Sequence, residues 1–138
     1  ASLAPLMAMP HRRQGRFRLV QHGAVSACIP LSLDLNRLTD AAIAERPLPA
    51  PPGATRCWAL RLALAFRQDL WRRLRAMRGL APAVVVQIGE GCATATALAC
   101  LLDGAAASPV VLDALDEIFD DAALRRNRVW ADRALRRQ

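Results

Sequence analysis

The residues that could carry out hydrolysis are sparse in this sequence. A serine hydrolase needs a serine nucleophile, a histidine base and an acid that orients the histidine. The chain has two histidines: His22 stands beside Gly23 at a predicted turn, and His11 lies in a basic stretch. No serine is flanked by the glycines of a nucleophile elbow; the three candidates are Ser26, Ser32 and Ser108. We therefore predict that the protein is not an enzyme.

Metal binding would need histidine, cysteine or carboxylate ligands at suitable spacing. Two acidic pairs stand four residues apart on a predicted helix, Asp113 with Glu117 and Asp116 with Asp120. No histidine or facing acid completes either pair, so we interpret them as a solvated face. The cysteines form no C-x-x-C pair and are interpreted as buried free thiols of a reducing compartment; they are Cys28, Cys57, Cys92 and Cys100. We predict no metal and no cofactor.

A glycine pair, Gly89 and Gly91, follows a continuous β-branched run at 83–88. One interpretation is a phosphate-binding turn that opens a helix. The third glycine of that pattern would fall on Thr94, and only 47 residues follow Gly91, too few for a doubly wound sheet. The alternatives are a hairpin, in which residues 92–100 return as a strand, and a plain junction with a helix. We favour these two over a ligand-binding loop.

Composition indicates one soluble globular domain with a net positive charge. The chain has 138 residues, 54% of them hydrophobic and 22% charged, and a formal net charge of +7. All 19 basic residues are arginine. Arginine binds phosphate and carboxylate in bidentate fashion, but a GC-rich genome also replaces lysine by arginine. Arginine richness therefore does not by itself predict nucleic-acid binding, and no stretch is long and apolar enough to predict a membrane span.

The N-terminal region is predicted to be separate from the globular part. We expect residues 1–15 to form a flexible basic segment and residues 16–138 to form a single domain. The apolar start of the chain precedes its charges, which is the reverse of a secretory signal, so we predict a cytoplasmic protein. Residues 1–18 contain four arginines and no acid, as a mitochondrial presequence does. Import into an organelle is therefore the minor alternative.

Alternating apolar and polar residues predict several strands. A short strand is expected at 16–21, and a longer one at 25–36 that contains Pro30. Because proline cannot donate to a ladder, that strand is expected at a sheet edge or with a bulge. Large residues occupy the even positions of 57–67, which favours a strand over a helix. Residues 83–88 predict a strand buried on both faces.

Capping residues predict the helices. We expect short helices at 38–45 and, with basic residues outward, at 70–78, and a proline-rich loop at 47–53. Ser108 and Pro109 predict the start of a C-terminal helix from about 109. A helix of roughly 28 residues would be about 42 Å long, so its end projects unless it bends near Asp120. The predicted fold is α+β, with a small antiparallel or mixed sheet of about five strands, a short basic helix and a long C-terminal helix.

Large apolar residues near the C-terminus predict a binding surface. Val129, Trp130 and Leu135 lie among arginines, beyond the point where a compact core would easily cover them. Such a pattern is typical of a partner-binding helix or a dimer seam. The open alternative is that the helix folds back and buries Trp130. We predict a non-enzymatic protein-interaction or assembly subunit of a larger intracellular complex, with a protein partner or self-association.

Nucleic-acid binding is the alternative function. One predicted helix face carries arginines that could contact phosphates, namely Arg72, Arg73, Arg75 and Arg78. Trp71 and Trp130 could stack on bases. Aromatic residues make up only 4% of the chain, and the acidic stretch at 113–121 would repel a phosphate backbone. We therefore rank this function, for RNA or DNA, below the protein-interaction role.

Overall fold

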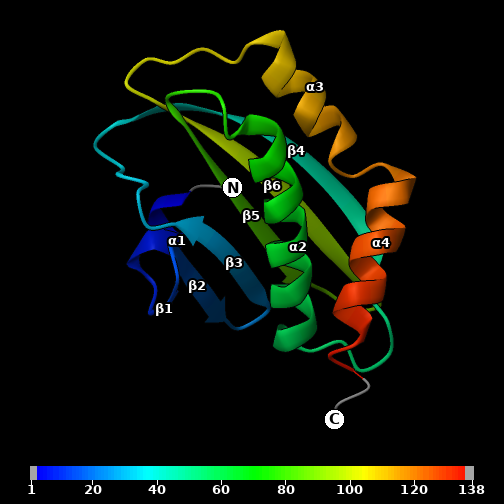
Figure 1. Cartoon of the computed structure of the whole chain (residues 1–138). Coiled ribbons are helices and arrows are strands. Elements are labelled where there is room, and N and C mark those ends of the chain that lie inside the picture. Colours follow the sequence, from blue (N-terminus) through cyan, green and yellow to red (C-terminus); the bar gives the residue numbers. More distant parts are fainter. Residues whose placement is uncertain (1–2, 136–138) are drawn as a thin grey trace.

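The computed structural model describes residues 3–135 as an α+β fold with an open antiparallel sheet (Figure 1). Six strands take the order β1-β2-β3-β5-β6-β4, one more than the sequence predicts. The elements are α1 (Leu3–Ala8), β1 (Arg12–Gln14), β2 (Phe17–His22), β3 (Val25–Pro30), β4 (Leu38–Pro49), α2 (Arg56–Leu74), β5 (Leu80–Ile88), β6 (Cys92–Leu102), α3 (Pro109–Glu117) and α4 (Asp121–Asp132).

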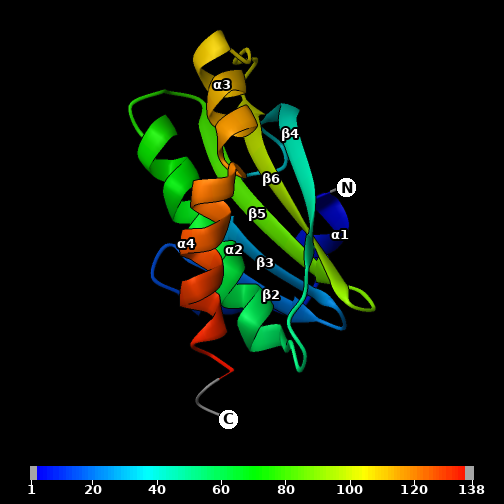
Figure 2. The same cartoon turned by 90° about the vertical axis from the view of Figure 1, so that its right-hand side faces the viewer.

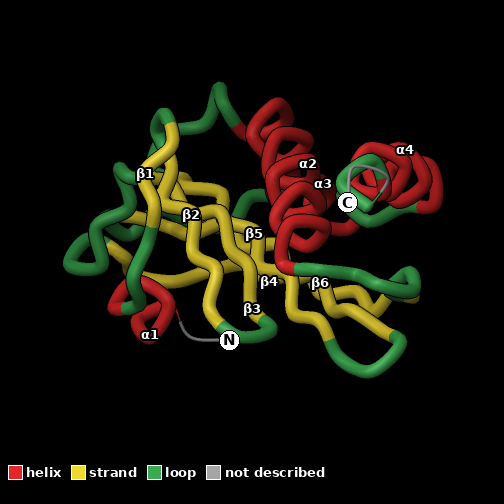
Figure 3. The backbone as a smooth tube through the Cα atoms, turned by 90° about the horizontal axis from the view of Figure 1, so that it is seen from below, coloured by secondary structure: helices red, strands yellow, loops and turns green. Residues whose placement is uncertain are grey.

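Helices cover the two faces of the sheet unequally. The helices α2, α3 and α4 lie on one face, and α1 lies on the other (Figure 2). The view from below shows the same layers, with the strands between α1 and the three larger helices (Figure 3). Leu3 and Leu6 of α1 are buried in the smaller core, against residues of β2, β3, β5 and β6. Residues 1–15, expected as a flexible segment, thus contain α1 and β1.

The larger core pairs small residues of the sheet with large residues of α2. Every second residue of β6 from Ala93 to Ala99 is an alanine that belongs to this core. An alanine face lets a helix approach the sheet closely, because no long side chain stands between them. Phe66 of α2 is fully buried and meets Phe119 edge to face, with ring centroids 4.9 Å apart. The alanine-rich strand thus requires a helix rich in leucine and aromatic residues.

The strand predicted at 57–67 is wrong, because this segment is the first part of α2. The helix predicted at 70–78 is the last part of the same helix, which ends at Leu74. Residues four positions apart lie on the same face in a strand and also in a helix, so the alternating pattern fits both structures. Four such residues are fully buried: Trp58, Leu62, Phe66 and Leu70. Thr55 caps the helix by accepting a hydrogen bond from the Trp58 N–H at 3.4 Å.

The helix predicted at 38–45 is also wrong, because Leu38–Pro49 forms the edge strand β4. The Ala50 N–H donates to the Gly91 carbonyl at 3.3 Å. Hydrogen-bonded positions alternate along an antiparallel ladder, so odd-numbered residues of β4 direct their backbone groups away from β6. Pro47 and Pro49 therefore remove no ladder hydrogen bond. The loop predicted at 47–53 starts only after Pro49.

The prediction that Pro30 lies on an edge strand or in a bulge is wrong. Its strand, β3, lies between β2 and β5. The pairing of β3 with β5 ends at Cys28 and Val84, two residues before the proline. Pro30 is the last residue of β3, so its missing N–H interrupts no pair of that ladder. The strand predicted at 25–36 ends at Pro30, because proline has no N–H with which pairing to β5 could continue.

The hairpin interpretation of Gly89 and Gly91 is confirmed. These glycines lie between β5 and β6, and the Gly89 N–H donates to the Cys92 carbonyl at 2.8 Å. Gly91 has a φ of 66°, which favours glycine. The single C-terminal helix is not observed: α3 ends at Glu117, and Asp120 caps a new helix by accepting from the Ala123 N–H. Within residues 3–135, no helix has both the length and the apolar character that a membrane crossing requires.

Candidate functional site

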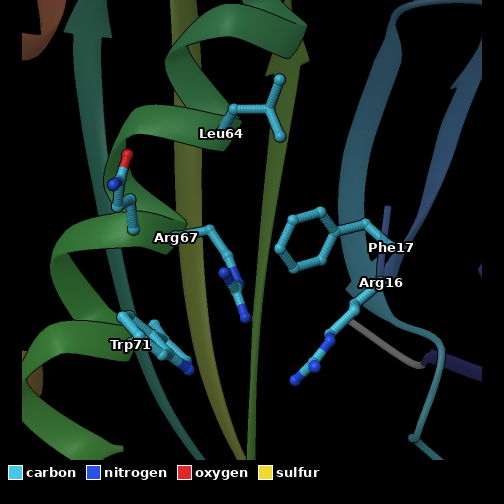
Figure 4. A pocket seen from close by; sticks show the side chains of 6 residues that line it. Arg16, Phe17, Leu64, Arg67 and Trp71 are labelled. Atoms are coloured by element: carbon cyan, nitrogen blue, oxygen red, sulfur yellow. The ribbon is translucent and has the colours of Figure 1, made fainter. Parts of the chain in front are cut away.

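A cavity of about 410 Å³ lies between β2 and the C-terminal half of α2 (Figure 4). We call it the basic groove, because two arginines and no acidic residue line it. Its other lining residues are two aromatic rings, a leucine and a glutamine. The complete set is Arg16, Phe17, Leu64, Arg67, Gln68 and Trp71.

Local structure fixes both walls of the basic groove. Arg16 lies in the turn between β1 and β2, next to Gly15, whose φ of 58° favours glycine. The Arg16 carbonyl accepts a hydrogen bond from the Leu31 N–H at 2.8 Å, which anchors the turn. The α2 residues of the groove stand at i, i+3, i+4 and i+7 from Leu64, so they form one stripe. The two walls thus come from segments about fifty residues apart in the sequence.

Arginines stack on both aromatic rings of the basic groove. The Arg67 guanidinium carbon lies 4.0 Å from the centroid of the Phe17 ring and 5.9 Å from that of Trp71. Arg75 approaches the same indole from further along the helix, at 5.5 Å. These distances are in the range of cation–π attraction. Trp71 is nevertheless 39% exposed, so part of the indole stays open to a ligand.

The charge of Arg67 is not neutralised within the described part of the chain. Its guanidinium makes no ion pair there, and its Nε is buried without a hydrogen-bond partner. Burial lowers the pKa of Arg67, an effect that the nearby Cys28 partly offsets. Burial also raises the pKa of the Cys28 thiol to about 11, so at neutral pH this thiol is uncharged and supplies no counter-charge. Among residues 3–135, Arg67 is therefore a partly desolvated cation that no anion accompanies.

The surroundings of the basic groove are also positive. Arginines in β1, β2 and the turn between them make no ion pair among residues 3–135; they are Arg12, Arg13, Arg16 and Arg18. The four ion pairs of the described chain leave the groove's residues out: they are Arg37–Asp103, Arg46–Asp121, Arg73–Glu117 and Arg126–Asp69. Positive charge thus collects at the β1–β2 side of the molecule, where it favours anions.

The predicted partner-binding residues do not share one environment. Trp130 is partly buried, and the Arg61 guanidinium lies over its ring at 4.6 Å. Leu135 packs against the larger core, whereas Val129 is 58% exposed. The Trp58 indole N–H donates to Asp132 at 2.9 Å, which ties α4 to α2. The alternative in which the C-terminal helix folds back describes Trp130 better than a projecting helix does.

The four arginines predicted to bind nucleic acid are also divided among different environments. Arg73 is paired with Glu117, and Arg75 stacks on Trp71. Arg72 lines a second cavity of about 310 Å³ that contains Asp69 and Glu117 as well. Arg78 follows the end of α2 and is exposed. Only Arg75 of the four therefore adjoins the basic groove.

Two of the serines considered for catalysis make structural hydrogen bonds. Ser26 donates to the Arg56 carbonyl at 3.3 Å, and Ser108 caps α3 by accepting from the Val111 N–H. His22, the last residue of β2, is exposed. Within residues 3–135, no three potential metal ligands gather at one place.

The sequence alone does not predict the basic groove. The helical spacing of Leu64, Arg67, Gln68 and Trp71 was the available signal, but a strand at 57–67 puts Leu64 and Arg67 on opposite faces. No protein-family model, curated protein or solved structure matches this chain. The geometry and charge of the basic groove are therefore the basis for a functional proposal.

Proposed function

We propose that the protein is a non-enzymatic protein-interaction or assembly subunit of a larger intracellular complex, and that the basic groove holds its partner. The observation that carries this proposal is Arg67, a partly desolvated guanidinium without a counter-ion in the described chain, beside an exposed indole. Tryptophan and arginine are enriched among the residues that dominate binding energies at protein interfaces. A partner that covers Trp71 and neutralises Arg67 would satisfy both groups at once.

The C-terminal helix α4 is a second surface for the same role. Val129 is 58% exposed there, but Trp130 is already stacked under Arg61. A partner at α4 would therefore cover one exposed valine. A partner in the basic groove would cover part of an aromatic ring and also form a contact with a charged group. The basic groove has the better support.

Nucleic-acid binding is the second candidate function. It is favoured by the arginines of β1 and β2, which make no ion pair within residues 3–135, and by the exposed Trp71 next to Arg75. Phosphate contacts of this kind make binding strongly salt-dependent. The acidic residues of α3, which include Glu117 beside Arg73, weaken this candidate because they would repel a phosphate backbone.

One purification experiment separates these candidates. The tagged chain is produced in cells that make it naturally and is purified with and without nuclease, at low and high salt. Size-exclusion chromatography with light scattering then measures the mass of the complex. Three variants are compared with the wild type: Arg67→Glu in the groove, Val129→Asp on α4, and Arg72→Glu as a control outside the groove.

We expect a complex of fixed mass that survives nuclease, whether with a partner or with a second copy, and that Arg67→Glu alone abolishes. Loss only with Val129→Asp would move the partner site to α4. A particle that disappears with nuclease and with salt would support the nucleic-acid candidate instead. A wild-type chain that is always monomeric would contradict the proposed function.

A further inference from the structure

We infer that the basic groove recognises an acidic segment of a protein partner, with a carboxylate between Arg16 and Arg67 and an apolar side chain against Trp71. This inference rests on the proposed function, since it assumes that the groove is the partner site. It adds the chemistry of the partner segment, which the proposed function leaves open.

The carboxylate position follows from the two arginines. Arg16 and Arg67 extend into the same space from the two walls of the groove (Figure 4). Like charges that converge in this way repel each other, and an anion between them removes the repulsion. A guanidinium presents its N–H groups in a planar fork that matches the two oxygens of a carboxylate.

The apolar position follows from the rest of the lining. Leu64, Phe17 and Trp71 surround the arginines with hydrocarbon. Arg67 already occupies a face of the Phe17 ring, whereas the indole of Trp71 is 39% exposed. An apolar side chain that follows or precedes the carboxylate can therefore cover the open part of Trp71. The volume of about 410 Å³ is within the range of sites that take small ligands or side chains.

The lining of the basic groove favours a short protein segment over a nucleic acid. Three of its six lining side chains are apolar, and of its two aromatic rings only Trp71 is exposed, because Phe17 is partly buried. A nucleic acid gains affinity when successive bases stack on several exposed rings, whereas an acidic peptide needs one carboxylate and one neighbouring apolar side chain. The second cavity, on the neighbouring side of α2, opposes neither ligand, because its acids Asp69 and Glu117 are each paired with an arginine. The single exposed ring therefore selects the acidic protein segment.

Peptide selection tests the inference with random sequences in place of a natural partner. Random ten-residue peptides displayed on phage are selected on the wild-type protein, and enriched peptides are then measured by calorimetry. Arg67→Met removes the guanidinium but keeps a long apolar side chain, and Arg67→Lys keeps the charge without the planar fork. Arg72→Met is the matched control, because Arg72 lies on the same helix outside the groove. Thermal unfolding of each variant verifies that it is folded.

We expect enriched peptides to place aspartate or glutamate next to phenylalanine, leucine or tryptophan. Their affinity is expected to fall roughly 10- to 100-fold with Arg67→Met, because a hydrogen-bonded charge contact is lost. Arg67→Lys is expected to weaken binding less, and Arg72→Met is expected to change it less than twofold. The same loss is expected when glutamine replaces the glutamate or aspartate of the peptide.

Other outcomes would overturn the inference. Enriched peptides without acidic residues that still depend on Arg67 would refute the acidic chemistry while leaving the groove as the partner site. Peptides that Arg67→Met and Trp71→Ala leave unaffected would refute the groove itself, and with it the proposed function. Absence of any enrichment, or Arg67-dependent binding of a ten-nucleotide oligothymidylate without peptide binding, would also overturn the acidic-segment assignment.

Discussion

Asp69 joins α2 to α4, and its removal should cost the protein a large part of its stability. The side chain is only 15% exposed. It accepts a hydrogen bond from the Asn127 amide at 2.9 Å and one from Arg126 at 2.6 Å. Asn127 is 5% exposed, so its amide has little access to water when the carboxylate is absent. Asp69→Ala therefore leaves a buried donor unsatisfied.

The size of this effect can be worked out from the two contacts. A hydrogen bond between a charged and a neutral group contributes about 1.5–3 kcal/mol, and its loss here also leaves the Asn127 amide buried without a partner. Arg126 is 61% exposed, so its ion pair with Asp69 adds at most about 1 kcal/mol. Together the two contacts predict that Asp69→Ala lowers the free energy of unfolding by about 2–4 kcal/mol.

Urea unfolding, followed by circular dichroism, measures this change. Arg37→Ala is the control, because it removes an ion pair with Asp103 in which both side chains are about half exposed. We expect that control to leave the free energy of unfolding close to the wild-type value, because exposed ion pairs contribute little to stability. An Asp69→Ala variant that loses no more than the control would refute the packing of α4 on α2. It would then restore the projecting C-terminal helix as an interaction surface.

Three further changes test other parts of the account. Phe66→Ala should lower the free energy of unfolding by about 3–5 kcal/mol in the same urea assay, since the ring is fully buried, and a loss below about 1 kcal/mol would contradict its place in the core. The pKa values of Cys28 and Cys100 are raised by burial to about 11, above the ordinary 9.0, so the contribution of these thiols to stability should be constant below about pH 9 and be lost between about pH 9 and 11 as the unfolded thiols ionise. No such fall in pH-dependent unfolding would contradict their burial. Gly79→Ala should lower the melting temperature, because φ is 76° and a Cβ would lie 2.9 Å from that of Ala105; an unchanged melting temperature would refute this close approach.

The sequence predicts correctly those elements whose residue pattern fits only one kind of secondary structure. The β-branched run at 83–88 fits a buried strand better than any other structure. In the structure it lies within β5. Ser108 and Pro109 marked the start of α3 because a serine cap and a proline in the first turn fit only that position. The turn at Gly89 was correctly favoured as a hairpin or junction over a phosphate-binding loop.

Tertiary contacts decided the elements that the sequence left ambiguous. Large residues at every even position of 57–67 fit a strand, and every second one of them also fits one helical face. The alanine face of β6 resolves this ambiguity, since it needs a helix with large side chains. Residues 38–45 carry no clear strand pattern, and pairing with β6 makes them part of β4.

The basic groove could be predicted only in part. Phe17 belongs to the strand that the sequence predicts at 16–21, whereas Arg16, predicted within that strand, lies in the turn before it. Their partners Arg67 and Trp71 needed α2 as a single helix and its position beside β2, which long-range packing determines. A prediction of α2 as a helix would have placed Leu64, Arg67 and Trp71 on one stripe, without showing what that stripe faces.

Nuclear magnetic resonance of the arginine and tryptophan side chains tests the central claim most directly. The ¹⁵N-labelled protein is titrated with the tightest peptide from the selection, and Arg67→Met and Trp71→Phe variants assign the relevant signals. We predict that the Arg67 Nε–H and Trp71 indole N–H signals shift together and saturate at one midpoint, while the Trp130 indole signal stays unchanged. Shifts confined to Trp130 and Val129, with Arg67 and Trp71 unmoved, would contradict the basic groove as the partner site.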